Sequence, residues 1–216
     1  KHAVATSAIE REDARVVTAP SGQQGVVKLL DGSMVTLMNG SSIRIPKGFG
    51  NELRSVRVIG SASVTAPPTL ATPLDVRAGL ASLVGAGTTF DVGAEQGRPA
   101  VVRVRLGELL VKTDASSRTI GVGQAVTIGA DGTVREPTPA ELRESLAWAD
   151  GRLVVEGRSL KEVLPMMRRW YGLDIGVADE ALFERSVTMD VPLSSSREAI
   201  EAIERSANVD FGYDNR

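Results

Sequence analysis

The sequence contains no cysteine and a single histidine, His2, next to the start of the chain. These absences exclude disulfides, thiolate nucleophiles and zinc clusters, together with any histidine-dependent triad or general base inside the fold. Aromatic residues make up only 4% of the chain, which argues against a stacking platform for single-stranded nucleic acid. The absence of cysteine fits an exported and a cytosolic protein equally, so it does not fix the compartment.

The chain also lacks an excess of one charge and a long apolar run. Its 25 basic and 27 acidic residues nearly balance, whereas an electrostatic binder of nucleic acid or lipid surfaces should be more basic. No apolar stretch approaches the roughly 20 residues that span a bilayer. No signal peptide opens the chain, which begins at Lys1, so we expect a processed or trimmed product whose targeting elements would lie outside these residues.

What the chain does have is a 42% hydrophobic content, enough for a packed core, and a length that suits one large or two small domains. After a weakly patterned lead-in (1–22), residues 23–136 are rich in Val, Thr, Gly and Ser, with short apolar alternations that predict an all-β domain. Six apolar residues at odd positions recur in pairs eight residues apart and can line one core: Val27, Leu29, Val35, Leu37, Ile43 and Ile45.

Further strands are predicted at Ser55–Ile59, Leu74–Arg77, Thr89–Val92, Ala100–Leu106, Leu109–Thr113 and Gln124–Ile128. Regularly spaced short strands favour a β sandwich or a twisted, solenoid-like β stack, and the pattern does not decide between the two. The Gly-containing dipeptides Asp31-Gly32, Asn39-Gly40 and Asp131-Gly132 match the demands of tight turns. A calcium loop would need several oxygen ligands at fixed spacing, which these sites lack.

Four acidic residues of this region could in principle supply the carboxylate pair of a glycosidase: Asp75, Asp91, Glu95 and Glu108. That chemistry requires two carboxyl groups several ångströms apart across one cleft. No spacing in the sequence establishes such a pair, so scattered surface acids are the better interpretation. We therefore expect no catalytic residue, no cofactor and no metal site.

A linker helix is predicted within residues 137–150, and a small α+β domain over residues 151–216 contains an internal repeat. Ser159 and Ser195 lie 36 residues apart, and each precedes a Glu three residues later, which is the pattern of a capping box. Each predicted helix leads into an alternating segment, 173–177 and 209–213. The repeat therefore predicts two β-α-β units, with Leu153 and Val155 corresponding to Met189 and Val191.

Helical spacing in the first unit separates a core face from a second face. Leu160, Val163, Leu164, Met167 and Tyr171 form one stripe, and Pro165 predicts a kink or a late start of the helix. Arg168, Arg169 and Trp170 would point away from that stripe, and an exposed Trp beside two Arg is typical of a protein interface. The alternative is that Trp170 packs back against the β domain.

With these elements in place, the chain resembles the periplasmic region of the FecR family of transmembrane anti-sigma regulators. Asp31-Gly32-Ser33, within 26–37, is similar to the family's L-x-DGS-x-V-x-L signature, and Gly87-Thr88 with Phe90 resembles its LGTxFxV. Trp148 and Gly151 are similar to the W-x-x-G-x-L opening of the C-terminal module, which has the short N-terminal fold of secretins and TonB-dependent receptors. Supporting segments are Arg57–Ala62, Pro73–Val76, Val104–Val111 and Gly123-Gln124.

The resemblance implies a signalling role without catalysis. In this family, a cytoplasmic segment holds an extracytoplasmic-function sigma factor, one inner-membrane helix follows, and the periplasmic part receives a signal from the signalling domain of a TonB-dependent outer-membrane receptor. Arg168, Arg169 and Trp170 are the predicted partner contact, and the signature residues are scaffold. The alternative hypothesis is a carbohydrate-binding β module of the cell wall or exterior, and a third is a carboxylate hydrolase. Nucleic acid is not an expected partner.

Overall fold

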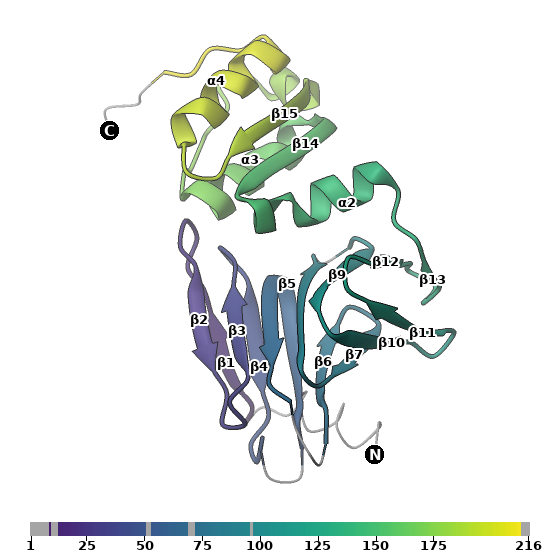
Figure 1. Cartoon of the computed structure of the whole chain (residues 1–216). Coiled ribbons are helices and arrows are strands. Elements are labelled where there is room, and N and C mark those ends of the chain that lie inside the picture. Colours follow the sequence, from purple (N-terminus) through teal and green to yellow (C-terminus); the bar gives the residue numbers. More distant parts are fainter. Residues whose placement is uncertain (1–8, 10–12, 51–52, 69–71, 96, 213–216) are drawn as a thin grey trace.

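The computed structural model describes the chain except for residues 1–8, 10–12, 51–52, 69–71, 96 and 213–216. It contains a β domain and a small α+β domain (Figure 1). A helix, α2 (Pro139–Leu146), and a 3-10 turn, η1 (Ala147–Asp150), connect them. Mainly β architecture followed by a small α+β domain confirms the predicted fold class.

The β domain is built on a 13-stranded sheet that folds over into two layers. One layer has the order β11-β10-β7-β6-β5-β4-β1, and the other has the order β13-β12-β9-β8-β5-β3-β2. The strands are β1 (Arg15–Thr18), β2 (Gly25–Lys28), β3 (Met34–Leu37), β4 (Ser42–Ile45), β5 (Ser55–Ala66), β6 (Leu74–Ala78), β7 (Ala81–Gly85), β8 (Thr88–Ala94), β9 (Ala100–Leu106), β10 (Glu108–Lys112), β11 (Ser117–Gly121), β12 (Ala125–Ile128) and β13 (Val134–Arg135).

Strand β5 belongs to both layers. Its first half pairs with β4 and β6, and its second half pairs with β3 and β8. Gly60 lies at the change of partner with φ of 92°, a conformation that favours glycine. A Cβ atom there would lie 2.6 Å from the Ser41 hydroxyl oxygen, so both the backbone angle and the close approach require glycine.

The two layers enclose one core, so the β domain is a sandwich and not a twisted, solenoid-like stack. All six odd-numbered apolar residues of the opening hairpins contribute to this core. Buried residues of β5 on both sides of Gly60, such as Val58 and Val64, face the same core. The eight-residue spacing therefore reported inward-facing strand positions correctly.

Several strands escaped prediction. Strand β1 lies inside the predicted lead-in and pairs with β4, so that part of the lead-in belongs to the β domain. It shows little burial, and β11 is largely polar, so neither carries a clear alternation. The short strands β7 and β13 were also missed.

The small domain places two helices against a two-stranded sheet. Strands β14 (Arg152–Ser159) and β15 (Ser186–Pro192) pair antiparallel, with Leu153 opposite Val191 and Val155 opposite Met189. Helices α3 (Leu160–Tyr171) and α4 (Ser196–Ala207) follow them, and a 3-10 turn, η2 (Glu180–Glu184), precedes β15. Ser159 and Ser195 are the N-caps, as the repeat predicted.

Two details of the repeat were wrong. The described residues of segments 173–177 and 209–213 form no strand, because the only ladder of this domain's described residues is β14–β15. Their alternation instead reflects packing, since Leu173, Ile175, Val177, Val209 and Phe211 lie half-buried on the helices' core. Tyr213 lies outside the described residues. Helix α3 begins at Leu160 and continues through Pro165, so the late start was also wrong.

None of the described helices has both the length and the apolar character that crossing a membrane demands.

Candidate functional site

The candidate functional site is the contact between the β domain and the small domain, where side chains of both domains are buried together. Met38, after β3, and Val101, on β9, lie in the same apolar cluster as the core of the small domain. Helix α2 contacts β8 and β9 on one side and β14 on the other. The domains therefore share a packed boundary instead of being joined by a bare linker.

Arg169 is the centre of this contact. Its Nε atom donates to the Asn39 carbonyl oxygen at 2.8 Å, and its Nη2 atom donates to the hydroxyls of Ser61 at 3.1 Å and Ser41 at 3.2 Å. Its Nη1 atom forms an ion pair with Glu95. The guanidinium group is planar and holds its N–H donors in a fixed geometry, so it can bind a carbonyl, two hydroxyls and a carboxylate at the same time. One side chain of α3 thus binds the loop between β3 and β4, strand β5 and the residue that follows β8.

Main-chain groups reinforce this contact. The Asn39 side-chain amide donates to the Trp170 carbonyl oxygen at 2.8 Å, and the Gly22 amide donates to the Arg169 carbonyl oxygen at 2.9 Å. Gly40 has φ of 68°, and a Cβ atom there would lie 3.0 Å from Arg169 Cγ. The Asn39-Gly40 dipeptide, predicted as a turn, therefore also leaves room for the arginine.

Trp170 is buried, with 5% of its surface exposed, so the expectation of an exposed tryptophan was wrong. Its ring stacks beneath Arg169, whose Cζ lies 4.9 Å from the ring centroid. The alternative interpretation, packing toward the β domain, describes its position. Of the predicted partner contact, only Arg168 is exposed.

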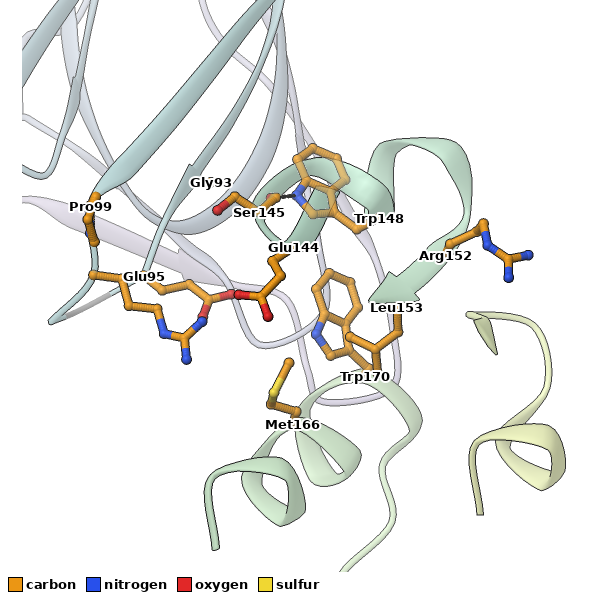
Figure 2. A pocket seen from close by; sticks show the side chains of 11 residues that line it. Gly93, Glu95, Pro99, Glu144, Ser145, Trp148, Arg152, Leu153, Met166 and Trp170 are labelled. Carbon is orange, nitrogen blue, oxygen red and sulfur yellow. Dashed lines mark hydrogen bonds between the residues drawn. The ribbon is translucent and has the colours of Figure 1, made fainter. Parts of the chain in front are cut away.

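A cavity lies between the domains, and Figure 2 shows the side chains that line it. Trp148 and Trp170 border it together with Met166 and Leu153, while Glu95 and Glu144 supply its carboxylates. The Trp148 indole donates to the Ser145 carbonyl oxygen at 2.7 Å. The same carbonyl lies against Gly93, where a Cβ atom would come within 2.7 Å of it. Helix α2 approaches β8 this closely only because residue 93 is glycine.

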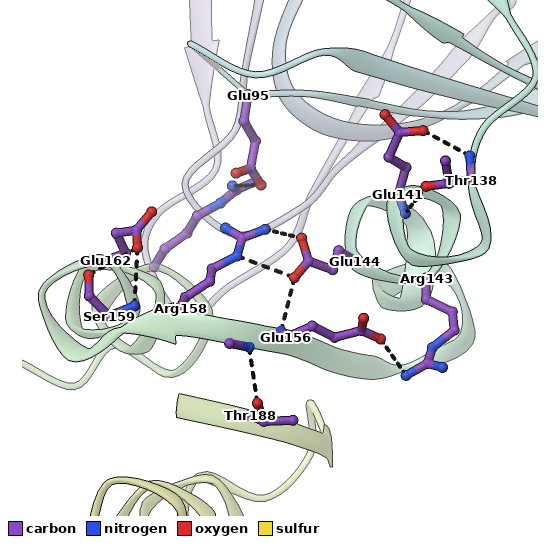
Figure 3. Close-up of polar contacts among 12 residues, drawn as sticks. Glu95, Thr138, Glu141, Arg143, Glu144, Glu156, Arg158, Ser159, Glu162 and Thr188 are labelled. Carbon is purple, nitrogen blue, oxygen red and sulfur yellow. Dashed lines mark hydrogen bonds and ion pairs between the residues drawn. The ribbon is translucent and has the colours of Figure 1, made fainter. Parts of the chain in front are cut away.

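Helix α2 is tied to β14 by a second group of charges (Figure 3). Glu144 pairs with Arg158 and accepts a hydrogen bond from the Glu156 amide at 2.9 Å, and Arg143 pairs with Glu156 at 2.7 Å. Burial raises the pKa of the Glu144 carboxyl above its ordinary value, and the carboxylates of Glu156 and Glu95 raise it further. The helix thus covers the outer edge of β14.

A third connection joins the outer surface of β8 and β9 to η1. The fully buried Asp91 accepts hydrogen bonds from Arg105 Nε at 2.5 Å and from Arg103 Nη2 at 3.2 Å. Arg105 also donates to the Ala149 carbonyl oxygen at 3.3 Å, and Arg103 lies 3.5 Å from an Asp150 carboxylate oxygen. Asp91 therefore orients two arginines toward the connector.

The Asp31-Gly32-Ser33 signature forms the turn between β2 and β3. Asp31 accepts hydrogen bonds from the Ser33 amide and hydroxyl, both at 2.9 Å, and from Arg54 Nη2 at 2.6 Å. Burial raises the pKa of Asp31, but these hydrogen bonds outweigh it and hold the pKa below its ordinary value. Gly32 has φ of 86°. The Asp31 carboxylate is therefore fully engaged by the turn residue Ser33 and by Arg54.

The other signature residues also occupy structural positions. Gly87 has φ of 62°, Thr88 donates from Oγ1 to the Leu106 carbonyl oxygen at 2.9 Å, and Phe90 is buried in the β core. Trp148 lies in the shared cluster, and Gly151, with φ of 75°, ends η1. Each of them thus makes a turn, a hydrogen bond or an apolar contact inside the protein.

The four acids considered for a carboxylate pair do not converge. Asp75 is bound by Ser82, Ser55 and Arg77 on the outer surface of β6, and Asp91 by its two arginines. Glu108 is exposed, and of the four only Glu95 lines the cavity. Among the described residues, no group of three or more potential metal ligands is assembled.

Sequence reasoning missed Asn39, Glu95 and Glu144 as parts of this contact. Asn39 was interpreted only as a turn residue, and Glu144 lies on a helix with no distinctive motif. The one sequence signal for the contact between the domains was the unusual run of two arginines followed by a tryptophan, Arg168, Arg169 and Trp170. Its polar partners are 74 to 130 positions away in the sequence.

Comparisons with known proteins agree with this arrangement. The chain matches the model described as FecR protein over residues 14–110 and the model described as FecR, C-terminal over residues 152–216. No curated protein matches it.

Two crystal structures of a protein from Parabacteroides distasonis ATCC 8503, provisionally described as an anti-sigma factor, share the fold. The 2.50 Å structure has a TM-score of 0.72 and 22% identity, with 94% of this chain and 95% of that chain covered. The 1.65 Å structure has a TM-score of 0.71 and 22% identity, with 93% and 95% covered. The likeness therefore extends over the fold of both domains. The chain belongs to the FecR family of signalling regulators.

Proposed function

We propose that this chain is the periplasmic sensor and transmitter region of an anti-sigma regulator in cell-surface signalling. It receives its signal by protein contact from the signalling domain of a TonB-dependent outer-membrane receptor. The membrane helix and the cytoplasmic segment that holds an extracytoplasmic-function sigma factor lie, on this proposal, outside these residues. Family membership supports the regulatory role.

The observation that carries the proposal is the polar attachment of the small domain to the β domain. Arg169 contacts four β-domain residues, and α2 is bound on both of its sides. A partner that shifts α3 must break or carry these contacts with it. Interfaces and packed cores switch between discrete arrangements, so such a contact can pass a signal from one domain to the other.

A titration calorimetry experiment tests this proposal. The chain is titrated with the signalling domain of the TonB-dependent receptor encoded beside it, and an unrelated receptor's signalling domain serves as the control. We expect saturable one-to-one binding to the former alone. Absence of binding at high protein concentration would refute the proposed function.

The carbohydrate-binding alternative gains no support from the surface. Sugar-binding platforms use exposed aromatic rings, whereas every aromatic side chain of the described residues is buried or half-buried. The buried ones are Phe49, Phe90, Trp148 and Trp170.

A further inference from the structure

The small domain contains a segment with the burial pattern of a strand but no strand partner. Residues 173–178 follow the glycine that ends α3, and their burial alternates. Leu173, Ile175 and Val177 lie half-buried against the helices, whereas the three residues between and after them are exposed. One face of this segment is therefore already packed, as in a strand laid over a core.

The main chain of this segment is open. Between Asp174 and Val177, the described residues supply no hydrogen-bond partner for its amides and carbonyls. The neighbouring sheet differs, because Glu144 accepts from the Glu156 amide at the edge of β14, and Ser206 accepts from the Thr188 amide of β15 at 2.8 Å. Among the described residues, nothing covers the main chain of 174–177 in this way, so this part of segment 173–178 can accept a strand.

The segment and the residues that follow it, up to Glu184, carry charge of one sign. Residues 172–184 include four acidic residues and no lysine or arginine, and all four are exposed: Asp174, Asp179, Glu180 and Glu184. A segment that docks alongside would be favoured if it carried positive charge, because complementary potentials steer association and suppress wrong partners. An acidic strand would meet repulsion at the same place.

We propose that segment 173–178 is a strand-addition site for an extended, lysine- or arginine-rich segment of a partner protein. Main-chain hydrogen bonds would supply affinity, and the alternate exposed positions would supply specificity. This inference rests on the proposed function for its role, because the docked strand would be that of the signal-giving protein. The contact itself is testable without that protein.

The probe is a short peptide, blocked at both ends, that alternates lysine with threonine or valine. Amide hydrogen exchange of the whole chain is followed by NMR with and without it. We expect slowed exchange at residues 174–177 and weaker binding as salt rises. Binding that slows exchange only elsewhere, or no binding at millimolar peptide, overturns the proposal.

A charge reversal with a matched control sharpens the test. Asp174→Lys should weaken binding of the lysine peptide by about twofold to fivefold, the range of exposed ion pairs, and should improve binding of a glutamate version of it. Asp114→Lys makes the same charge change on an exposed position of the β domain and should leave both affinities unaltered. Equal effects of the two substitutions would overturn the assigned site.

The two proposals can fail separately. If the receptor's signalling domain binds the chain but the peptide does not protect residues 174–177, the strand-addition site is refuted and the proposed function remains. If the peptide protects the segment but the receptor domain does not bind, the site is supported and the proposed function is refuted.

Discussion

The two domains differ in how completely their backbones are paired. In the β domain, β5 alone is bonded to four other strands, and both layers close over one core. Among the described residues of the small domain, a single two-stranded ladder supports two helices, and the alternating segments 173–177 and 209–212 remain outside that ladder. Isolated two-stranded sheets are marginally stable, so the small domain depends on what packs against it.

This difference shows where stability and responsiveness reside. The β domain supplies its own framework, whereas the small domain draws on Arg169, Trp170 and α2 for attachment to that framework. Elements that respond to a partner are drawn from the less stable part of a protein. Substitutions at the boundary should therefore affect the small domain more than the β domain.

The largest effect is expected for Trp170→Ala. Removing this buried ring leaves a cavity in the shared cluster and should lower the free energy of unfolding of the small domain by about 3–5 kcal/mol. Urea denaturation with amide exchange as the local measure should show early opening of β14, while exchange in β5 is unchanged. Trp170→Phe, which keeps an aromatic ring, is the control and should cost less. Equal loosening of β5 would contradict the asymmetry.

Arg169→Ala should have the next largest effect. It removes the hydrogen bonds to Asn39, Ser41 and Ser61 and the ion pair with Glu95, and should cost about 2–3 kcal/mol. Arg168→Ala, one residue away and exposed, is the matched control and should change stability by less than about 0.5 kcal/mol. Thermal unfolding should be measured by scanning calorimetry. We expect the two domains to unfold in separate transitions in Arg169→Ala, and in a single transition in Arg168→Ala. Similar curves for both variants would rule out Arg169 as the anchor.

Gly93→Ala should have a smaller, purely steric effect. Its Cβ atom would lie 2.7 Å from the Ser145 carbonyl oxygen, which forces α2 away from β8 at about 1.5 kcal/mol. Gly176→Ala is the control, because no atom lies within 4 Å of the Cβ it would add. Melting temperatures of the two variants provide the measurement. A harmless Gly93→Ala would mean that α2 is not closely seated.

The smallest expected effect depends on pH. A hydrogen bond from Arg135 is the main cause that lowers the pKa of Glu141 to about 2, from 4.5 in the unfolded chain. Because the folded-state pKa is depressed, this contribution is complete above pH 4.5 and is lost as pH falls toward 2. Glu141→Gln should therefore melt at a lower temperature than the parent near neutral pH, and the gap should close on acidification. A gap that persists at pH 2 would contradict this linkage.

Most of the fold could be predicted because strands of the β domain and helices of the repeat carry periodic burial. The two-residue spacing of Val35 and Leu37 predicts the buried face of a strand, and the four-residue spacing of Val163 and Met167 predicts the buried face of a helix. Of the strands that were missed, β1, β11 and β13 are edge strands with little burial, so they carry no clear periodicity. Strand β7 lies between β6 and β10 and is buried at four of its five residues, so its burial does not alternate either. Segment 173–177 shows the opposite error, in which burial alternates without a ladder.

The boundary between the domains could be predicted only in part. Arg169 and Trp170 were recognised as an unusual pair, but helical spacing alone assigned them to solvent. Their partners Asn39 and Glu95 lie far away in the sequence and serve as ordinary turn and strand-end residues locally. Which surface receives a side chain follows from the packing of whole domains, and no local pattern encodes it.

The place at which Arg169 docks has a mechanical consequence. Ser61 directly follows Gly60, where β5 passes from one layer to the other, and the Ser61 amide donates to the Ser41 hydroxyl oxygen at 2.9 Å. A displacement of α3 would therefore act on β5 at the point where this strand passes from one layer to the other, and not on an edge strand. Because β5 pairs with strands of both layers, a displacement at this point would reach both of them.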